Sequence, residues 1–267
     1  IMATRLDSLP GPVLMVDVGT NGEIVLSHDG TMSAASTAAG PAFEGARISC
    51  GMRGRQGAIE KVVLDGEVRL GVIGSARPVG LCGSGLIDLM AELLRVGLVS
   101  HEGALIGPDD LPADSPQWLR DRVGLDDDGQ PFFTLARLDE SGTGHPIRFT
   151  QRDVRELQLG CGAVRAGIAI LLKDAGISAA DLQTVLIAGG FGSFIRRDKA
   201  QRVGLIPPEV DHQRISFVGN VSLAGARWSL LSADTRKHGE VLARRTRHVE
   251  LSTDPGFQME FAEAMIF

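Results

Sequence analysis

Apolar residues along this chain fall into short runs separated by glycine-rich turns, a pattern that predicts strands and helices in alternation. The first run, 13–18 (VLMVDV), is predicted to be a buried strand, and the turn at 19–22 (GTNG) leads into a second strand from Glu23. Two apolar runs joined by a short glycine-containing turn predict a β-hairpin. Residues 31–39 alternate weakly and are predicted to form a third strand.

The segments after residue 39 show the same pattern, and their alternating strands and helices predict an α/β layer architecture. A second hairpin is predicted over 58–75, because Asp65-Gly66 is a strong turn signal between two apolar runs. Thr150, as N-cap, and Asp153 predict the start of a long amphipathic helix that runs to about Asp174. The remaining predictions are strands over 184–188, 214–221 and 245–251 and helices over 197–202, 222–231 and 254–265.

Three glycines interrupt the long helix, at Gly160, Gly162 and Gly167. Each lowers helix propensity by roughly 1 kcal/mol, so something should approach that face of the helix closely. A packed strand and a bound ligand would both satisfy this requirement.

The tip of the first hairpin carries a carboxylate, a hydroxyl, an amide and two glycines, namely Asp17, Gly19, Thr20, Asn21 and Gly22. Glycines let a backbone approach a ligand closely, and N–H groups exposed in such turns bind phosphate oxygens. Asp17 is suited to hold a magnesium ion that accompanies the phosphates, through water. The alternative is an ordinary tight hairpin in which Asp17 bonds the turn backbone.

A second glycine-rich turn, Gly83-Ser84-Gly85, precedes a helix that ends at Gly97. Ser84 is predicted to be its N-cap. Unpaired N–H groups and a positive dipole favour anions at a helix N-terminus, so a nucleotide contact is one hypothesis. Close packing of the helix on a sheet through these glycines is the other. Cys82 is predicted to be a small buried residue.

The strand predicted at 184–188 runs into a third turn, Gly189-Gly190-Phe191-Gly192, which precedes a short helix. The carboxyl end of a strand is where open α/β sheets bind ligands. If this turn and the tip of the first hairpin hold opposite ends of one nucleotide, they must lie at the same edge of the sheet.

Composition narrows the classes of protein that fit. A chain of 267 residues, 43% hydrophobic and 22% charged, predicts a soluble globular protein of one large or two small domains. The net charge of −6 argues against nucleic-acid or anionic-membrane partners, and the apolar runs are shorter than a membrane span. Three widely spaced cysteines indicate neither a disulfide framework nor a four-thiolate metal site, so we expect a cytoplasmic protein. An aspartate-rich segment, 103–145, is predicted to be a solvated insertion with short strands.

Eight short motifs follow one another along the chain: DVGTNGEIVL (17–26), AAGPAFEGA (38–46), GMRG (51–54), GLCGSGLID (80–88), TQRDVRELQL (150–159), LIAGGFGSFI (186–195), GLIP (204–207) and GNVSLAGA (219–226). Together they resemble the C-terminal region of the ATP-dependent reductive activators of corrinoid proteins. That family belongs to the acetate and sugar kinase, heat-shock chaperone and actin (ASKHA) superfamily.

The resemblance implies an α/β fold, with residues 1–267 as the second ribonuclease-H-like lobe of an actin-like ATPase, a mixed sheet with flanking helices. The opening Ile1-Met2 agrees with a piece of a longer protein. ATP with Mg²⁺ would bind in the cleft between two lobes. The hairpin tip, with Asp17 as catalytic and magnesium-binding residue, would be the phosphate loop. Gly189 to Gly192 would be the adenosine loop.

Activators of this kind use ATP to drive the one-electron reduction of cobalt(II) to cobalt(I) in a partner corrinoid protein. The electron comes from a [2Fe–2S] cluster in an N-terminal domain that this sequence does not include. The resemblance implies the same partner here, with a homodimer as one assembly it allows. We expect this chain alone to bind nucleotide poorly, because half a cleft buries too little of the ligand.

One position departs from the expected pattern, because Cys161 stands where we expect a lysine in the long helix. If that lysine contacts the nucleotide in relatives, affinity is lower here, and Cys161 itself is predicted to be a core residue. Two other functions stay open. One is a non-catalytic docking module for a corrinoid or other partner protein, and the other is a small-molecule kinase of the same superfamily.

Overall fold

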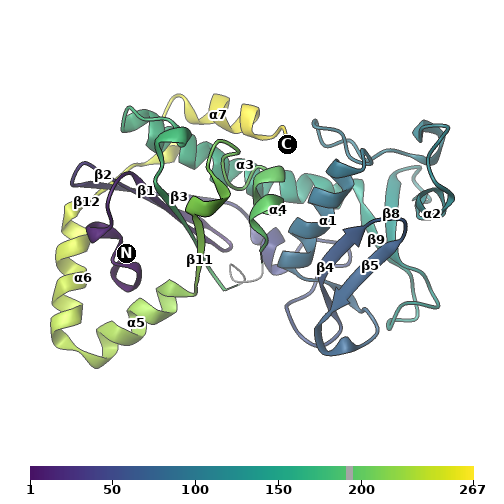
Figure 1. Cartoon of the computed structure of the whole chain (residues 1–267), viewed down its shortest axis with the longest axis horizontal. Coiled ribbons are helices and arrows are strands. Elements are labelled where there is room, and N and C mark those ends of the chain that lie inside the picture. The colour runs from purple at the N-terminus through teal and green to yellow at the C-terminus, as the bar shows by residue number, and fades with distance from the viewer. Residues whose placement is uncertain (191–194) are drawn as a thin grey trace. The chain divides into compact units, whose positions relative to one another are not determined.

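A six-stranded sheet with the order β11-β10-β1-β2-β3-β12 organises the first part of the fold (Figure 1). The computed structural model describes residues 1–190 and 195–267, which divide into unit 1 (1–39 and 162–264) and unit 2 (40–161 and 265–267). The sheet belongs to unit 1. Its strands are β1 (Val13–Val18), β2 (Gly22–His28), β3 (Thr31–Thr37), β10 (Thr184–Ala188), β11 (Ile215–Gly219) and β12 (Thr246–His248).

Strand direction makes this a mixed sheet. Strands β1, β2 and β3 form the predicted antiparallel hairpin and its extension. Strand β10 lies on the other side of β1 and is parallel to it, and β11 is parallel to β10. Strand β12 is parallel to β3 at the far edge. The carboxyl ends of β1, β10 and β11 therefore share one edge of the sheet.

One face of the sheet packs on the N-terminal turns and on α6 (Ala233–Arg245). Met15 of β1 and Leu186 of β10 form one buried cluster with Leu6, from the turn η2 (Leu6–Ser8), and Leu242 of α6. Burying an aliphatic side chain of this size stabilises a fold by roughly 1.5–3 kcal/mol. Because side chains alternate along β1, Met15 lies on this face of the sheet and Leu14 and Val16 lie on the other.

The opposite face packs on the second half of α3 (Gln151–Asp174), whose bounds match the predicted helix. A Cβ added at Gly167 would lie 2.6 Å from Ile24 Cδ1 and 2.6 Å from Thr37 Cγ2. Glycine is required there because β2 and β3 approach the helix too closely for any side chain. A packed strand therefore explains Gly167 without a ligand.

Three other helices of unit 1 fall where the sequence predicts them: α4 (Arg197–Arg202), α5 (Val221–Leu231) and α7 (Phe257–Ala264). Helix α6 was not predicted, because Leu242 is its one buried residue and the apolar periodicity is weak. Its N-terminus carries a local signal, the Ser232 Oγ that accepts a hydrogen bond from the Thr235 N–H at 3.2 Å. Within the described residues, no helix combines the length and apolar character that crossing a membrane requires.

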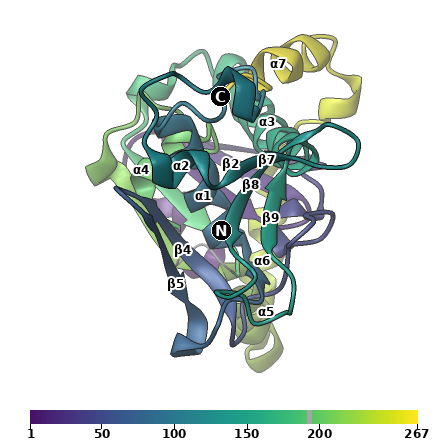
Figure 2. The same cartoon turned by 90° about the vertical axis from the view of Figure 1, so that its right-hand side faces the viewer.

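Unit 2 contains two three-stranded sheets (Figure 2). The first, β5-β4-β6, confirms the predicted hairpin, since Leu64 pairs with Val68 across the Asp65-Gly66 turn. The second has the order β7-β8-β9. The elements of the unit are β4 (Ala58–Leu64), β5 (Val68–Val72), β6 (Gly80–Leu81), α1 (Gly83–Arg95), α2 (Gln117–Arg120), β7 (Val123–Leu125), β8 (Pro131–Ala136) and β9 (Ile147–Thr150).

Residues 103–145, expected to be a solvated insertion with short strands, include β7 and β8. Aspartates such as Asp109 and Asp127 are exposed, whereas Phe133 and Leu135 of β8 are fully buried. The segment therefore joins acidic, solvated turns to a strand that has fully buried side chains.

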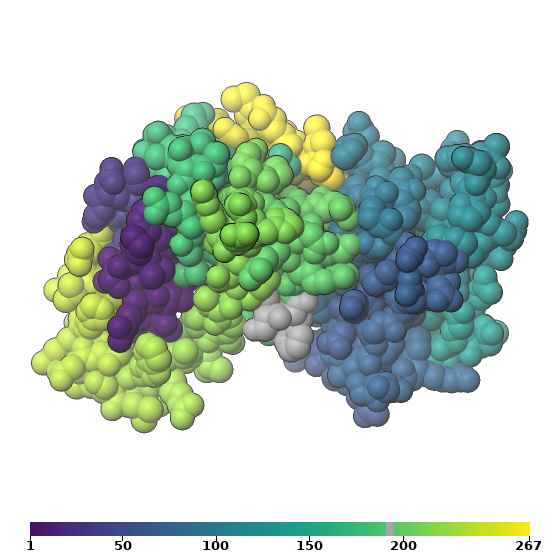
Figure 3. Space-filling model, in the orientation of Figure 1, coloured from purple at the N-terminus to yellow at the C-terminus, as the bar shows by residue number. Residues whose placement is uncertain are grey.

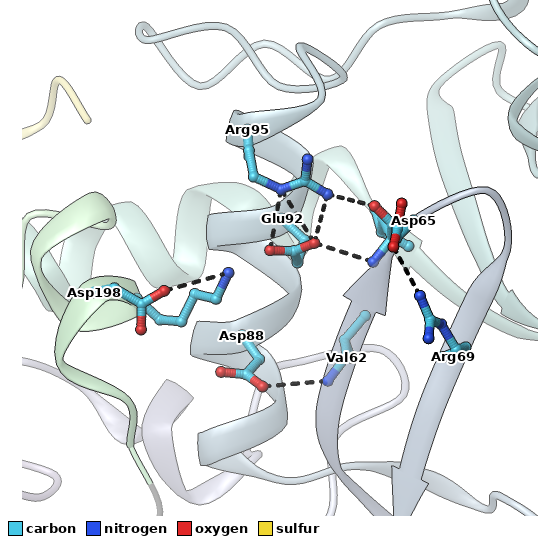
Figure 4. A network of polar contacts seen from close by, with 9 residues as sticks. Val62, Asp65, Arg69, Asp88, Glu92, Arg95 and Asp198 are labelled. Carbon is cyan, nitrogen blue, oxygen red and sulfur yellow. Dashed lines mark hydrogen bonds and ion pairs between the residues drawn. The ribbon is translucent and has the colours of Figure 1, made fainter.

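Two carboxylates of α1 complete the hydrogen bonding of β4 (Figure 4). Along β4, the two-residue strand β6 reaches only Ala58 and Ile59. Beyond it, the Val62 N–H donates to Asp88 Oδ2 at 3.2 Å and the Leu64 N–H donates to Glu92 Oε2 at 3.0 Å. Residues four apart on a helix match alternate amides of a strand, so α1 replaces the missing neighbour strand.

The N-terminus of α3 is held by a buried carboxylate, as the Thr150–Asp153 spacing predicts. Asp153 Oδ2 accepts hydrogen bonds from the Thr150 N–H at 2.8 Å and the Thr150 hydroxyl at 2.9 Å. Its Oδ1 accepts from the Ser49 N–H at 2.7 Å and the Ser49 hydroxyl at 3.0 Å. Asp153 is fully buried, and its four donors fix the loop at Ser49 to the start of the helix.

We predict that Asp153→Ala destabilises the protein by about 2–4 kcal/mol, because two backbone N–H groups lose their acceptor along with the helix cap. Urea unfolding followed by circular dichroism measures this change. Asp127→Ala, at an exposed aspartate, is the control and should shift the free energy of unfolding by less than about 0.5 kcal/mol. Equal midpoints for the two variants would contradict a structural role for Asp153.

Candidate functional site

The carboxyl ends of β1, β10 and β11 bring three turns of unit 1 to one edge of the sheet. Asp17 pairs with Ala188 in the β1–β10 register, and Ala188 pairs with Gly219 in the β10–β11 register. Gly189, which follows Ala188, therefore lies at the edge of the sheet where the hairpin tip begins. This edge is the place where open α/β sheets bind ligands.

Asp17 is the partly buried carboxylate at this edge. Its Oδ2 accepts a hydrogen bond from the Ser222 hydroxyl at 3.0 Å, and Ser222 lies in the first turn of α5. Among the described residues, the Asp17 carboxylate is therefore hydrogen-bonded to a helix that is distant in the sequence, and not to the turn that follows it. The exposed Glu23 is its cross-strand partner, so a second carboxylate leaves the same face of the hairpin.

The hairpin tip itself is a short closed turn. The Gly19 N–H donates to the Asn21 carbonyl at 3.0 Å, which commits that N–H within the turn. Thr20 and Asn21 are exposed at the tip. Gly22 is buried, and a Cβ there would lie 2.7 Å from Thr37 Oγ1 and 2.8 Å from a methyl of Val164. The packing of α3 therefore accounts for the glycine at position 22, and the exposed part of the turn is Thr20-Asn21.

Gly189 is locked between the neighbouring strand ends. Its φ of +115° lies in a region that residues with a side chain rarely adopt. A Cβ added there would lie 2.4 Å from the Val18 carbonyl oxygen and 3.3 Å from Asp17 Oδ1. Its N–H donates to the Gly219 carbonyl at 3.1 Å. Close packing against the end of β1, beside Asp17, therefore requires glycine at position 189.

Gly190 differs from its neighbour, because a Cβ added there meets no atom of the described residues within 4 Å, and the residue is exposed. Its backbone is therefore open to a ligand. Phe191 and Gly192, which the sequence also predicts as nucleotide contacts, lie outside the described residues.

Gly83, Ser84 and Gly85 belong to unit 2 and form the first turn of α1, so the edge of the unit 1 sheet is built without them. Ser84 was predicted to be the N-cap, which is wrong, because that position is Cys82 and Ser84 is buried inside the helix. A Cβ at Gly83 would lie 2.0 Å from the Phe43 carbonyl oxygen, and one at Gly85 would lie 2.2 Å from that of Ile59. Close packing therefore explains both glycines.

The two buried cysteines are core residues, as predicted. Cys82 is 6% exposed, and its thiol donates to the Ile59 carbonyl at 3.2 Å. Cys161 is 3% exposed on the apolar side of α3. Neither residue presents a thiol at the surface, so packing accounts for both.

Sequence reasoning missed two residues at the edge, Asn220 and Ser222. Asn220 is the N-cap of α5, where its Oδ1 accepts from the Leu223 N–H at 2.9 Å. An asparagine between a predicted strand and a predicted helix is typical of an N-cap, so this residue could have been found from the sequence. The contact between Ser222 and Asp17 joins residues far apart in the sequence, and no local pattern reveals it.

The edge is suited to a magnesium ion that arrives with phosphate. The described residues include no cluster of three or more His, Cys, Asp or Glu side chains that could hold a metal by themselves. Magnesium needs no such cluster, since one or two carboxylates with water and substrate phosphates suffice. Asp17 supplies a partly buried carboxylate whose Oδ1 has no hydrogen bond recorded among the described residues.

Comparisons with known proteins identify this arrangement as an ASKHA domain. A family profile described as the C-terminal domain of RACo, the ASKHA domain, matches residues 11–267. The solved structure of a reductive activator for corrinoid,iron-sulfur protein superposes with a TM-score of 0.87 and 36% sequence identity, over 99% of this chain and 41% of that one. The fold class predicted from the sequence is thereby confirmed. The chain belongs to the family of RACo C-terminal ASKHA domains.

Two curated relatives extend the comparison. The corrinoid activation enzyme RamQ of Eubacterium limosum is 40% identical over 91% of this chain and 41% of its own length. The [Co(II) methylated amine-specific corrinoid protein] reductase of Methanosarcina barkeri is 30% identical over 82% of this chain and 38% of its own length. The chain thus spans about two fifths of the proteins it resembles.

The two adjacent glycines allow a matched test of the edge. Gly189→Ala should lower the free energy of unfolding by about 2–4 kcal/mol, because it combines an unfavourable φ with a clash against the Val18 carbonyl. Gly190→Ala, in open space, should change it by about 0.5 kcal/mol or less. Urea unfolding of both variants checks this, and similar losses in the two would contradict the described backbone.

Proposed function

We propose that this chain is the nucleotide-binding part of a corrinoid reductive activator. In this proposal ATP binding and hydrolysis drive the transfer of one electron to the cobalt(II) of a partner corrinoid protein, which becomes cobalt(I). The electron comes from a [2Fe–2S] cluster carried by another domain of the full-length protein. The names of the two curated relatives and of the solved structure all concern activation or reduction of corrinoid proteins, which supports this partner.

The observation that carries the nucleotide assignment is the meeting of Asp17 and Gly189 at adjoining strand ends. These strand ends place the Asp17 carboxylate beside the start of a glycine turn whose next residue, Gly190, is exposed. The open backbone at Gly190 lies next along the chain and suits the adenosine end of the nucleotide. Thr20 and Asn21, exposed at the hairpin tip, suit the phosphate end.

Asp17 is the residue of this chain that would hold Mg²⁺, through water. Bound Mg²⁺ neutralises phosphate charge and so favours transfer of the γ-phosphoryl group to water. The contribution of the chain's own residues is orientation, because a carboxylate and turn backbones fixed before the reaction need no rearrangement during it. Hydrolysis coupled to domain closure would then change the environment of the partner's cobalt.

Asp17→Asn in the full-length protein tests this proposal. The substitution removes the negative charge with almost no change in shape, and we expect it to weaken binding of Mg²⁺–ATP at least about tenfold, a loss that removing an outer-shell partner of a metal can already cause. Isothermal titration calorimetry measures the affinity. ATP-dependent formation of cobalt(I) in a corrinoid protein, followed by its absorbance, measures the activity.

Asp29→Asn is the matched control, with the same charge change in the exposed turn between β2 and β3, at the other end of the hairpin. Its positive φ of 47° suits asparagine, so the fold should be unaffected. If Asp17→Asn binds Mg²⁺–ATP as tightly as the Asp29→Asn control does, the nucleotide assignment is wrong and a docking module becomes the better account. Phosphorylation of a small molecule without cobalt reduction would favour a kinase.

A further inference from the structure

Among the described residues, the contact between Ser222 and Asp17 is the one hydrogen bond recorded between α5 and β1. Asp17 ends β1, and Ser222 is the second residue of α5, after β11. The Ser222 hydroxyl donates to Asp17 Oδ2 at 3.0 Å. The bond therefore depends on the parallel β1-β10-β11 order, which brings both elements to the same edge.

Helix α5 does not need this hydroxyl for its own stability. A serine near a helix start usually accepts a hydrogen bond from a backbone N–H as a cap. Here Asn220 already fills that role, with its Oδ1 accepting from the Leu223 N–H at 2.9 Å. Ser222 is thus released from capping, and its hydroxyl proton points to the carboxylate instead.

The bond also contributes little to holding α5 in place. Ser222 is exposed, and α5 has no fully buried residue, with Leu223 and Leu230 65% and 77% exposed. Helices α5 and α6 form the yellow-green surface at the lower left of Figure 3. A solvent-exposed hydrogen bond typically stabilises a fold by about 1 kcal/mol or less. Its main effect is therefore on the carboxylate.

When a hydrogen bond holds one oxygen of a carboxylate, the plane of the group and the direction of its other oxygen are fixed as well. Oδ2 accepts the Ser222 hydroxyl, while Oδ1 lies beside Gly189 and has no hydrogen bond recorded among the described residues. Outer-shell partners of this kind orient the groups that hold metals, and removing them typically costs 10–100-fold in metal affinity or activity. We propose that Ser222 is a positioning residue that orients Asp17 toward Mg²⁺–nucleotide. This inference rests on the proposed function.

The test uses the full-length protein and compares ATP binding with Mg²⁺ and with EDTA. Ser222→Ala should weaken Mg²⁺–ATP binding about tenfold and leave metal-free ATP binding within about twofold, because the defect acts through the metal site. Ser222→Thr keeps the hydroxyl and should restore Mg²⁺–ATP affinity. Ser229→Ala, the same change on the same helix, is the control and should bind like the unaltered protein.

A double-mutant cycle separates this inference from the proposed function. If Ser222 acts through Asp17, Ser222→Ala should cause no further loss in an Asp17→Asn background. An equal loss in both backgrounds, or no loss from Ser222→Ala where Asp17→Asn weakens binding, would overturn the positioning role alone. Unchanged affinity in Asp17→Asn itself would overturn the proposed function and the positioning role together.

Discussion

The parallel register between β1 and β10 is the constraint on which the candidate site depends. It sets Asp17 beside Ala188, so the turn that follows each strand begins at the same edge of the sheet. The next residue after Ala188 must be glycine, because the Val18 carbonyl at the end of β1 leaves no space for a side chain there. A shift of one residue would turn Asp17 to the opposite face of the sheet.

The glycines of this chain differ in what surrounds them. At Gly83, Gly85 and Gly167 they allow backbones or side chains of neighbouring elements to pack closely. At Gly189 the same kind of close approach occurs beside a carboxylate, whereas the space around Gly190 holds no atom of the described residues within 4 Å of an added Cβ. A glycine-rich turn is therefore evidence of a ligand only when the structure shows what lies opposite each glycine.

Much of the fold follows from local pattern. The apolar runs, the Asp65-Gly66 turn and the Thr150–Asp153 cap give the hairpins and the long helix with nearly the observed bounds. Helix α6 does not follow, because a helix with one buried residue lacks apolar periodicity. Ser84 was misassigned because a serine after glycine suggests a cap, whereas the observed N-cap, Cys82, lies two residues earlier.

The site was predictable to a lesser degree. Asp17 and Gly189 could be proposed because each follows a buried strand, but whether they meet depends on strand order, which no local pattern encodes. Ser222 lies beyond such reasoning for the same reason. Gly22 was grouped with the exposed turn although its place is under α3, a tertiary contact invisible in the sequence.

A crystal structure of the full-length protein with Mg²⁺ and a non-hydrolysable ATP analogue tests the central claim most directly. We predict triphosphate density at the edge formed by Asp17 and the hairpin tip, with the adenosine toward Gly190. A nucleotide bound elsewhere, with this edge covered by protein, would contradict the account.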